Sequence, residues 1–344
     1  MTKCCANCFD DRGLRVSIIP MRSSGSGKCS YCETESVTLV EPKELNEYFS
    51  LVTAIYRPDN NGKTLVEWLR EDWSLFTHPK MDDAHAKELL ADILDDGEIV
   101  RKKFSPSELC NTDSMESWSR LKNELMYENR FFPENDLNEE RFEELLQRLE
   151  LNSTDISAKW YRARIQPDES TFSLDEMGAP PRRISSHGRA NPAGIPYLYL
   201  GSIPNTAVAE IRPHAGELAS VAKFNLNSDL RIVDLKNPRG LVSPFLLSDE
   251  NEIALLRGDI EFLEHLGNEL TRPVLPRAAA IDYIPSQYVC EFIKKCGYDG
   301  VIYKSSVSEG INFALFQPEK ATPITVETHN VTSVKVEVER YLSG

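Results

Sequence analysis

The sequence predicts an α+β protein with three regions of different character, and three observations support this. Five of the eight cysteines fall within the first 32 residues. Apolar residues then recur at helical spacing up to about residue 150, and short β-type runs between turn-forming residues follow. We therefore expect a cysteine-stapled module at 1–41, a helical domain at 42–152 and a mainly antiparallel sheet domain at 153–344. A chain of 344 residues is long enough for several cores.

Composition and charge narrow the class of protein. The hydrophobic fraction of 41% and the charged fraction of 27% are those of a soluble globular protein. No apolar run approaches the roughly 18 residues of a membrane span, and no signal-peptide stretch is present, so we expect a cytoplasmic protein. The net charge of −15 argues against a protein that coats nucleic acid. An arginine-rich island at 182–189 instead suits a compact anionic ligand such as a nucleotide.

The first region has the cysteine spacing of a zinc ribbon. Cys5-x2-Cys8 is followed, after twenty residues, by Cys29-x2-Cys32. Two such pairs complete a closed tetrahedral site, so the zinc would be structural. Cys4 is an alternative to Cys5 as the first ligand, and a chance cluster of cysteines is the other interpretation.

The second region carries apolar stripes at helical spacing. They predict four to six helices, at 45–52, 65–73, 89–94, 118–125 and 142–149. This region shows no evident catalytic constellation, so we expect it to act as a scaffold or regulatory element.

The third region alternates strand and turn signals. Strands are expected in the runs AKWYRARI, LYLGS, VAKFNL, LRIVDL, DGVIYKSS and NFALF, and helices at 249–266 and 286–296. Within it, residues 188–211 (GRANPAGIPYLYLGSIPNTAVAEI) predict a loop, a strand and a helix that ends near Glu210. Side chains alternate along a strand, so Tyr197 and Tyr199 should share one side of it. Such a passage is typical of a small-molecule site.

Three blocks of this region resemble the RES domain, a family named for an Arg, a Glu and a Ser and known as the toxin half of bacterial toxin–antitoxin pairs. The blocks are YRAR at 161–164, GRANPAGIPYLYLGS at 188–202 with Glu210, and QYVCEFIKKCGYDGVIYKSSVSEGINFALF at 287–316. The resemblance implies an ADP-ribosyltransferase-like fold, degradation of NAD by hydrolysis or phosphorolysis, and a neutralising antitoxin partner. It places the name-giving residues at Arg162, Glu210 and Ser305. Arg189 and Tyr199 lie at further motif positions, Asn191 is a further candidate for substrate binding, and the neighbouring Arg164 and Ser306 leave the register open.

The N-terminal part is similar to the HEPN-like helical domain, which accompanies some RES proteins behind paired cysteine knuckles. HEPN ribonucleases carry an Arg-x4-His motif. Arg70 and His78 are eight residues apart, and no arginine of the helical region has a histidine five residues on. We therefore do not expect this domain to cleave RNA.

The chemistry of NAD cleavage agrees with the resemblance. Breaking the nicotinamide–ribose bond builds positive charge on the ribose, as in glycosidases, but nicotinamide leaves as a neutral group and needs no general acid. One carboxylate near the sugar then suffices, and we assign this role to Glu210. Arg162 and Arg189 would clamp the pyrophosphate, one of Tyr197 and Tyr199 would stack on nicotinamide, and Ser305 would offer its hydroxyl to the amide or ribose.

Two alternative functions remain open from the sequence. An enzyme that transfers ADP-ribose to a macromolecule would carry nearly the same residues. A non-catalytic nucleotide sensor, or a regulator whose zinc module binds nucleic acid, would be favoured if Arg162, Glu210 or Ser305 were missing, and all three are present. The sequence does not distinguish water from phosphate as the acceptor, nor a monomer from a homo-oligomer.

Overall fold

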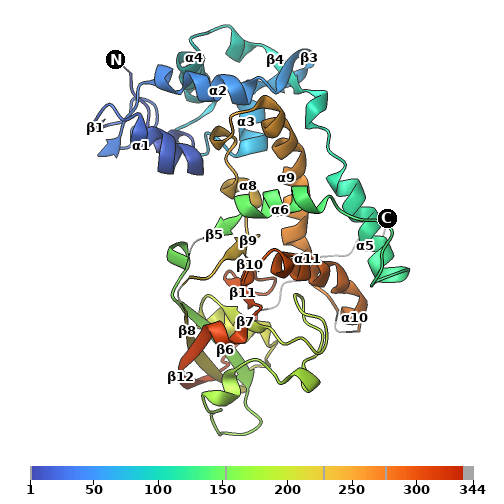
Figure 1. Ribbon diagram of the computed structural model, residues 1–344. Coiled ribbons are helices and arrows are strands. Elements are labelled where there is room, and N and C mark those ends of the chain that lie inside the picture. The colour runs from blue at the N-terminus through green and yellow to red at the C-terminus, as the bar shows by residue number, and fades with distance from the viewer. Residues whose placement is uncertain (1, 152, 228, 276, 336–344) are drawn as a thin grey trace. The chain divides into compact units, whose positions relative to one another are not determined.

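The computed structural model describes residues 2–151, 153–227, 229–275 and 277–335 (Figure 1). Internal contacts divide the chain into two compact units. The first holds the residues up to Leu121, Asn135–Leu137 and Asn237–His265. The second holds Lys122–Glu134, Asn138–Lys236 and the residues from Leu266 onward. Residues 237–265, which the sequence placed with the sheet domain, are thus grouped with the N-terminal part.

The first unit is mostly helical with two small hairpins. Its cysteine-rich start contains a short π-helical turn, Leu14–Ile18, and the hairpin of β1 and β2. Its elements are β1 (Ser26–Gly27), β2 (Val37–Thr38), α1 (Ile19–Met21), α2 (Asn46–Thr53), β3 (Tyr56–Thr64), α3 (Leu65–Trp73), α4 (Asp83–Leu94), β4 (Lys103–Pro106), α8 (Pro238–Leu241) and the first parts of α5 (Ser114–Tyr127) and α9 (Glu250–Thr271).

Local sequence signals explain where these helices start. Thr64 accepts a hydrogen bond from the Glu67 amide, and the Glu67 carboxylate accepts one from the Thr64 amide, which is a complete capping box at the start of α3. Asp82 caps α4 by accepting from the amide of His85 at 3.0 Å. The expected helices of this region are confirmed as α2 to α6, whereas the β3–β4 hairpin was not predicted. A relationship to HEPN domains stays a prediction.

The second unit is built on a mixed sheet, which confirms the expected α+β class. The described strands run in the order β12-β8-β6-β7-β11-β10-β9-β5. Among the described strands, only β9 and β10 pair in parallel. The strands are β5 (Glu150–Leu151), β6 (Lys159–Ile165), β7 (Leu198–Gly201), β8 (Leu218–Leu226), β9 (Ile232–Asp234), β10 (Gly300–Lys304), β11 (Ile311–Leu315) and β12 (Ala321–Asn330), and the helices that lie wholly in this unit are α6 (Glu139–Arg148), α7 (Pro204–Glu210), α10 (Ala279–Asp282) and α11 (Ile284–Lys295).

The sheet is split between β6 and β7. These strands share a single paired position, Tyr161 with Gly201, whereas β6 pairs with β8 at seven positions. Backbone groups beyond Tyr161 are therefore not shared between β6 and β7, and the two strands are free to separate. The gap between them is where side chains from both halves of the sheet meet.

Helix α7 lies close to this split because small residues face it. Ala163 of β6 and Ala207 of α7 belong to one buried apolar cluster with Val221 of β8. At Gly310, after β10, an added Cβ would lie 1.9 Å from Thr206 Oγ1, so only glycine allows the turn before β11 to approach α7 this closely. The close approach brings the end of α7, with Glu210, next to β10 and β11. In the described part of the chain, no helix combines the length and apolar character that crossing a membrane requires.

Candidate active site and candidate metal centre

A pocket of about 240 Å³ opens at the split in the sheet. Four of the residues that the sequence singled out line it, which are Arg162, Arg189, Tyr199 and Glu210. They come from β6, the loop before β7, β7 itself and the end of α7. The fold therefore brings together residues that are up to 48 positions apart in the chain.

Hydrogen bonds from described residues reach only one of the two oxygens of the Glu210 carboxylate. Its Oε1 accepts hydrogen bonds from Ser305 Oγ at 2.7 Å and from Asn312 Nδ2 at 2.6 Å. No hydrogen bond or ion pair from a described residue reaches its Oε2. Two neutral donors fix the carboxylate without cancelling its charge, so the second oxygen remains available to a ligand.

Ser305 is hydrogen-bonded to Glu210. Its hydroxyl donates to Glu210 and accepts from the amide of Val307 at 3.2 Å. With its donor used and one lone pair occupied, the hydroxyl orients the carboxylate and does not itself need to touch a ligand. We therefore regard Ser305 as a positioning residue.

Arg162 has unused hydrogen-bonding capacity. Its Nη1 donates to the carbonyl of Tyr199 at a long 3.4 Å, and its buried Nε has no hydrogen-bond partner among the described residues. Burial lowers the pKa of Arg162 to about 10, so the guanidinium is still cationic at neutral pH. A half-buried cation with free donors is suited to an anionic ligand.

Arg189 is already engaged by the protein. Its Nη1 donates to the carbonyl of Arg272 at 2.6 Å, and its Nη2 donates to Ser306 Oγ at 3.1 Å. Its guanidinium carbon lies 5.6 Å from the centre of the Tyr283 ring. Ser306 therefore holds the pocket wall through Arg189, while Ser305 holds Glu210, and the two neighbouring serines have separate tasks.

Asn191 and Tyr199 stabilise the loop that precedes β7. The Tyr199 hydroxyl donates to Asn191 Oδ1 at 2.7 Å and accepts from the amide of Ala190 at 3.0 Å. The buried Asn191 amide nitrogen donates to the carbonyls of Ser186, Pro192 and Ile195. Only the ring of Tyr199 is left to form the pocket wall. Burial raises the pKa of Tyr199, so its hydroxyl stays protonated and keeps this bond.

Gly188 leaves room for the hydrogen bond between Asn191 and Tyr199 that stabilises this loop. A Cβ at this position would lie 2.3 Å from Asn191 Oδ1 and 2.4 Å from the Tyr199 hydroxyl. A larger residue would have to displace the bond between these two side chains. The Gly-Arg-Ala-Asn sequence thus forms a rigid pocket wall.

Five of the nine residues proposed from the sequence do not line the pocket. Asn191, Ser305 and Ser306 are hydrogen-bonded to lining residues, and the other two are Tyr197 and Arg164. Tyr197 is not among the lining residues, because it is buried against Phe316 with a ring separation of 4.8 Å, and its hydroxyl donates to Glu291 at 3.4 Å. Arg164 is exposed, and its Nη1 donates to the carbonyl of Glu176 at 2.6 Å. Between the two arginines of the YRAR block, Arg162 is the one in the pocket.

Four polar residues of the pocket were not predicted from the sequence, which are Asn312 and three of its four tyrosines, Tyr161, Tyr283 and Tyr303. Asn312 is 5% exposed and stands in the otherwise apolar run INFALF. A buried amide in a strand must find partners, so this residue carried a usable signal. The tyrosines gave none, because tyrosines in strands and helices are ordinary core residues.

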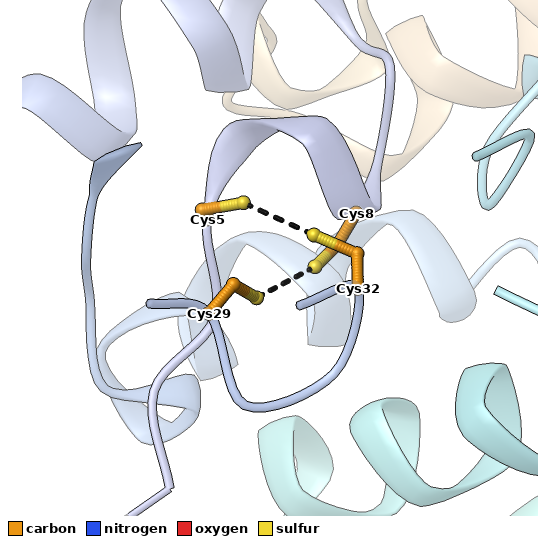
Figure 2. Close-up of side chains that lie close together, drawn as sticks. All are labelled: Cys5, Cys8, Cys29 and Cys32. Atoms are coloured by element: carbon orange, nitrogen blue, oxygen red, sulfur yellow. Dashed lines mark hydrogen bonds between the residues drawn. The ribbon is translucent and has the colours of Figure 1, made fainter. Parts of the chain in front are cut away.

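The four cysteines of the first region form a compact group, as Figure 2 shows. The Sγ atoms of Cys5 and Cys32 are 3.5 Å apart, those of Cys8 and Cys29 are 3.4 Å apart, and all four lie within 4.8 Å of one another. A tetrahedron with Zn–S bonds of about 2.3 Å has S–S edges of about 3.8 Å. The thiols therefore fit a tetrahedral ion such as zinc, with little movement needed.

Cys4 stands outside this group. Its Sγ is directed to the carbonyl of Val40 at 3.7 Å, and burial raises its pKa. Its backbone forms a bridge with Val40. The geometry thus favours Cys5 over Cys4 as the first member of the cluster.

Comparison with known proteins places this site in a family. The family model of the RES domain matches residues 159–335, slightly more than half of the chain. No curated protein matches. The M. tuberculosis MbcT–MbcA toxin–antitoxin complex contains a chain 15% identical over 54% of this chain and 92% of that one, but a TM-score of 0.31 supports no argument from its structure. The residues matched by the family model include every described side chain that lines the pocket, and this chain belongs to the RES-domain family.

Proposed function

We propose that this protein degrades NAD by cleaving its nicotinamide–ribose bond, and that it acts as a toxin or defence effector of the RES type. The observation that carries the proposal is the carboxylate of Glu210, fixed through Oε1 by Ser305 and Asn312 with Oε2 left for a ligand. A fixed negative charge is what an oxocarbenium-like transition state requires. Because the carboxylate does not have to reorient during the reaction, its full charge acts on the transition state.

Arg162 supplies the second part of the proposal. NAD carries two negative charges on its pyrophosphate, and Arg162 is a half-buried cation whose buried Nε has no hydrogen-bond partner among the described residues. Burial without a counter-ion disfavours the charged form, and an incoming phosphate would relieve that cost. Arg189, which is already bonded to Arg272 and Ser306, would form the wall beside it.

The chemistry is balanced with either acceptor. The C–N bond to nicotinamide breaks and its electron pair leaves with nicotinamide, while the ribose cation is captured by water or by phosphate. Water yields ADP-ribose and a proton, and phosphate yields ADP-ribose 1″-phosphate. Glu210 would oppose the developing positive charge in both reactions.

The test is to incubate the purified protein with NAD, with and without inorganic phosphate, and to identify the products. We expect nicotinamide with ADP-ribose or its phosphate. Unchanged NAD would contradict the proposal. Labelled macromolecules after addition of cell extract would instead support a transferase. A neutralising partner protein, which the family resemblance implies, stays a prediction.

A structural zinc ion at Cys5, Cys8, Cys29 and Cys32 is a separate part of the proposal. The support is the spacing of the four sulfur atoms, all within 4.8 Å of one another. With four thiolate ligands the ion would have no open position, so it would stabilise the N-terminal module and take no part in cleavage.

A further inference from the structure

The last residue of α5 and the loop after it expose three aromatic side chains. Tyr127, Phe131 and Phe132 are 67%, 84% and 82% exposed. This aromatic loop, residues 127–134, belongs to the second unit and precedes the RES-domain match, so the proposed reaction gives it no task. Two neighbouring phenylalanines in solvent are costly, because each would bury about 150–250 Å² in a protein interior.

Hydrogen bonds hold the aromatic loop in shape. Asn129 Nδ2 donates to the carbonyl of Phe132 at 2.6 Å, and the amide of Phe132 donates to Asn129 Oδ1 at 3.2 Å. The amide of Glu134 donates to the buried carboxylate of Glu124 at 2.6 Å. The phenylalanines are therefore presented by an ordered turn, and binding through them would cost little conformational entropy.

A groove elsewhere in the second unit is lined by apolar and cationic residues, which complement the aromatic and acidic side chains of the aromatic loop. It measures about 630 Å³ and is lined by Pro180–Arg182, Ile195–Pro196, Lys294 and Phe316–Glu319. About half of its lining is apolar and includes proline and isoleucine side chains, and two cations, Arg182 and Lys294, also line it. Glu319 is the one opposing charge in the lining. Arg182 is exposed and forms no ion pair with a described residue.

We propose that the aromatic loop of one copy seats in this groove of a second copy, and that the contact is reciprocal and forms a two-fold dimer. The aromatic loop carries exposed Glu128, Arg130 and Glu134, a net charge of −1, whereas the groove carries Arg182, Lys294 and Glu319, a net charge of +1. Opposite charges on the two surfaces favour this pairing and disfavour loop against loop. A two-fold axis makes each copy give one loop and receive the other.

The aromatic area of the reciprocal contact, if fully covered, overlaps the lower part of the range of specific interfaces. Six aromatic side chains at about 150–250 Å² each supply about 900–1,500 Å² before the groove surface is added. Specific interfaces bury about 1,200–2,000 Å² in total. One loop in one groove supplies about half as much aromatic area and would leave a weak, transient contact.

Sedimentation of the full chain over a wide concentration range tests the proposal. We expect a reversible dimer whose dissociation constant rises at least about a hundredfold in Phe131→Ser/Phe132→Ser. Glu134→Arg or Arg182→Glu alone should each weaken it about tenfold, and the chain that carries both reversals should recover most of that loss. Both positions are exposed, so the variants should keep the wild-type unfolding temperature.

Met21→Ser serves as the matched control, because Met21 is 73% exposed and lies outside both surfaces. It should leave the dissociation constant unchanged. The proposal is overturned by a wild-type chain that is monomeric throughout, by a dimer insensitive to the phenylalanine variant, or by charge reversals that fail to restore each other. The readout does not involve NAD, so it stands apart from the proposed activity.

Discussion

At the scale of single residues, the pocket combines a carboxylate and a guanidinium group, neither of which forms an ion pair with a described residue. Glu210 accepts only from neutral donors, and no ion pair joins it to a lysine or arginine of the described chain. Arg162 likewise has no carboxylate partner there. Charged side chains without a partner in a partly buried pocket lower the stability of the fold. One negative and one positive group of this kind therefore indicate a binding site for a ligand that carries both a positive and a negative charge. NAD has an anionic pyrophosphate and a cationic nicotinamide ring.

The Glu210→Gln variant tests the carboxylate. The amide keeps the size of the side chain but removes the charge that opposes the ribose cation. We expect kcat for NAD consumption to fall about 10²–10³-fold, with a much smaller change in KM. Glu309→Gln is the control, because Glu309 is an exposed acid on the loop after Ser305. Wild-type activity in Glu210→Gln would remove the proposed role.

The Arg162→Ala variant tests the phosphate clamp. A hydrogen bond to a charged group contributes about 1.5–3 kcal/mol, so we expect kcat/KM to fall about 10–100-fold, mostly through KM. Arg162→Lys keeps the charge but loses the planar fork, and it should recover only part of the loss. Steady-state kinetics with NAD separates the two. A fall in kcat with KM unchanged would place Arg162 at the reacting bond instead.

At the scale of elements, the sequence predicted most of the parts and missed those whose partners are distant. The six expected strands of the third region and helix α7 are confirmed, because apolar runs bounded by Gly and Pro define them locally. The ten-residue strand β12 was missed, because its outer face is polar and Pro323 interrupts it at a bulge. Its pairing with β8 provides its hydrogen bonds, and no local pattern reports that pairing.

Tyr197 and Tyr199 also show that a local sequence pattern cannot report pairing with a distant strand. Alternation predicted that they share one side of a strand, but β7 begins at Leu198, so Tyr197 lies before the strand and faces the core. To predict which of the two tyrosines enters the pocket, it was therefore not enough to predict that a strand exists here. The residue at which β7 begins also had to be known. Strand ends are set by pairing with β11, which lies more than one hundred residues along the chain.

The Tyr199→Phe variant tests the role of the loop before β7. It removes the bonds to Asn191 and Ala190 but keeps the ring in the pocket wall. Leaving these groups without a partner costs about 1–3 kcal/mol, so we expect a lower unfolding temperature with KM for NAD changed only a few-fold. Thermal unfolding and kinetics measure both. A large loss of kcat at unchanged stability would mean that the hydroxyl contacts the substrate.

At the scale of the whole molecule, function depends on bringing together segments that the chain keeps apart. Glu210 meets Ser305 and Asn312 because α7 lies against strands that are contributed by the last third of the chain. The sequence identified Glu210 and Ser305 by resemblance, but sheet order is what makes them neighbours. The fold also brings the cysteine cluster together over a shorter stretch of chain. Its two Cys-x2-Cys pairs are separated by twenty residues, and their sulfur atoms lie next to one another.

Removing the cysteine ligands tests the proposed metal at this scale. Cys29→Ser/Cys32→Ser leaves two thiols, which cannot close a tetrahedral site, so the purified variant should lose the roughly one zinc expected per chain. Because binding of a structural metal contributes directly to folding, the N-terminal module should then be cleaved faster in limited proteolysis. Cys4→Ser is the matched control, since the Sγ of Cys4 is directed to Val40 and lies outside the cluster. Elemental analysis should find wild-type zinc in Cys4→Ser, whereas zinc retained by the double variant, or absent from wild type purified without chelators, would contradict the assignment.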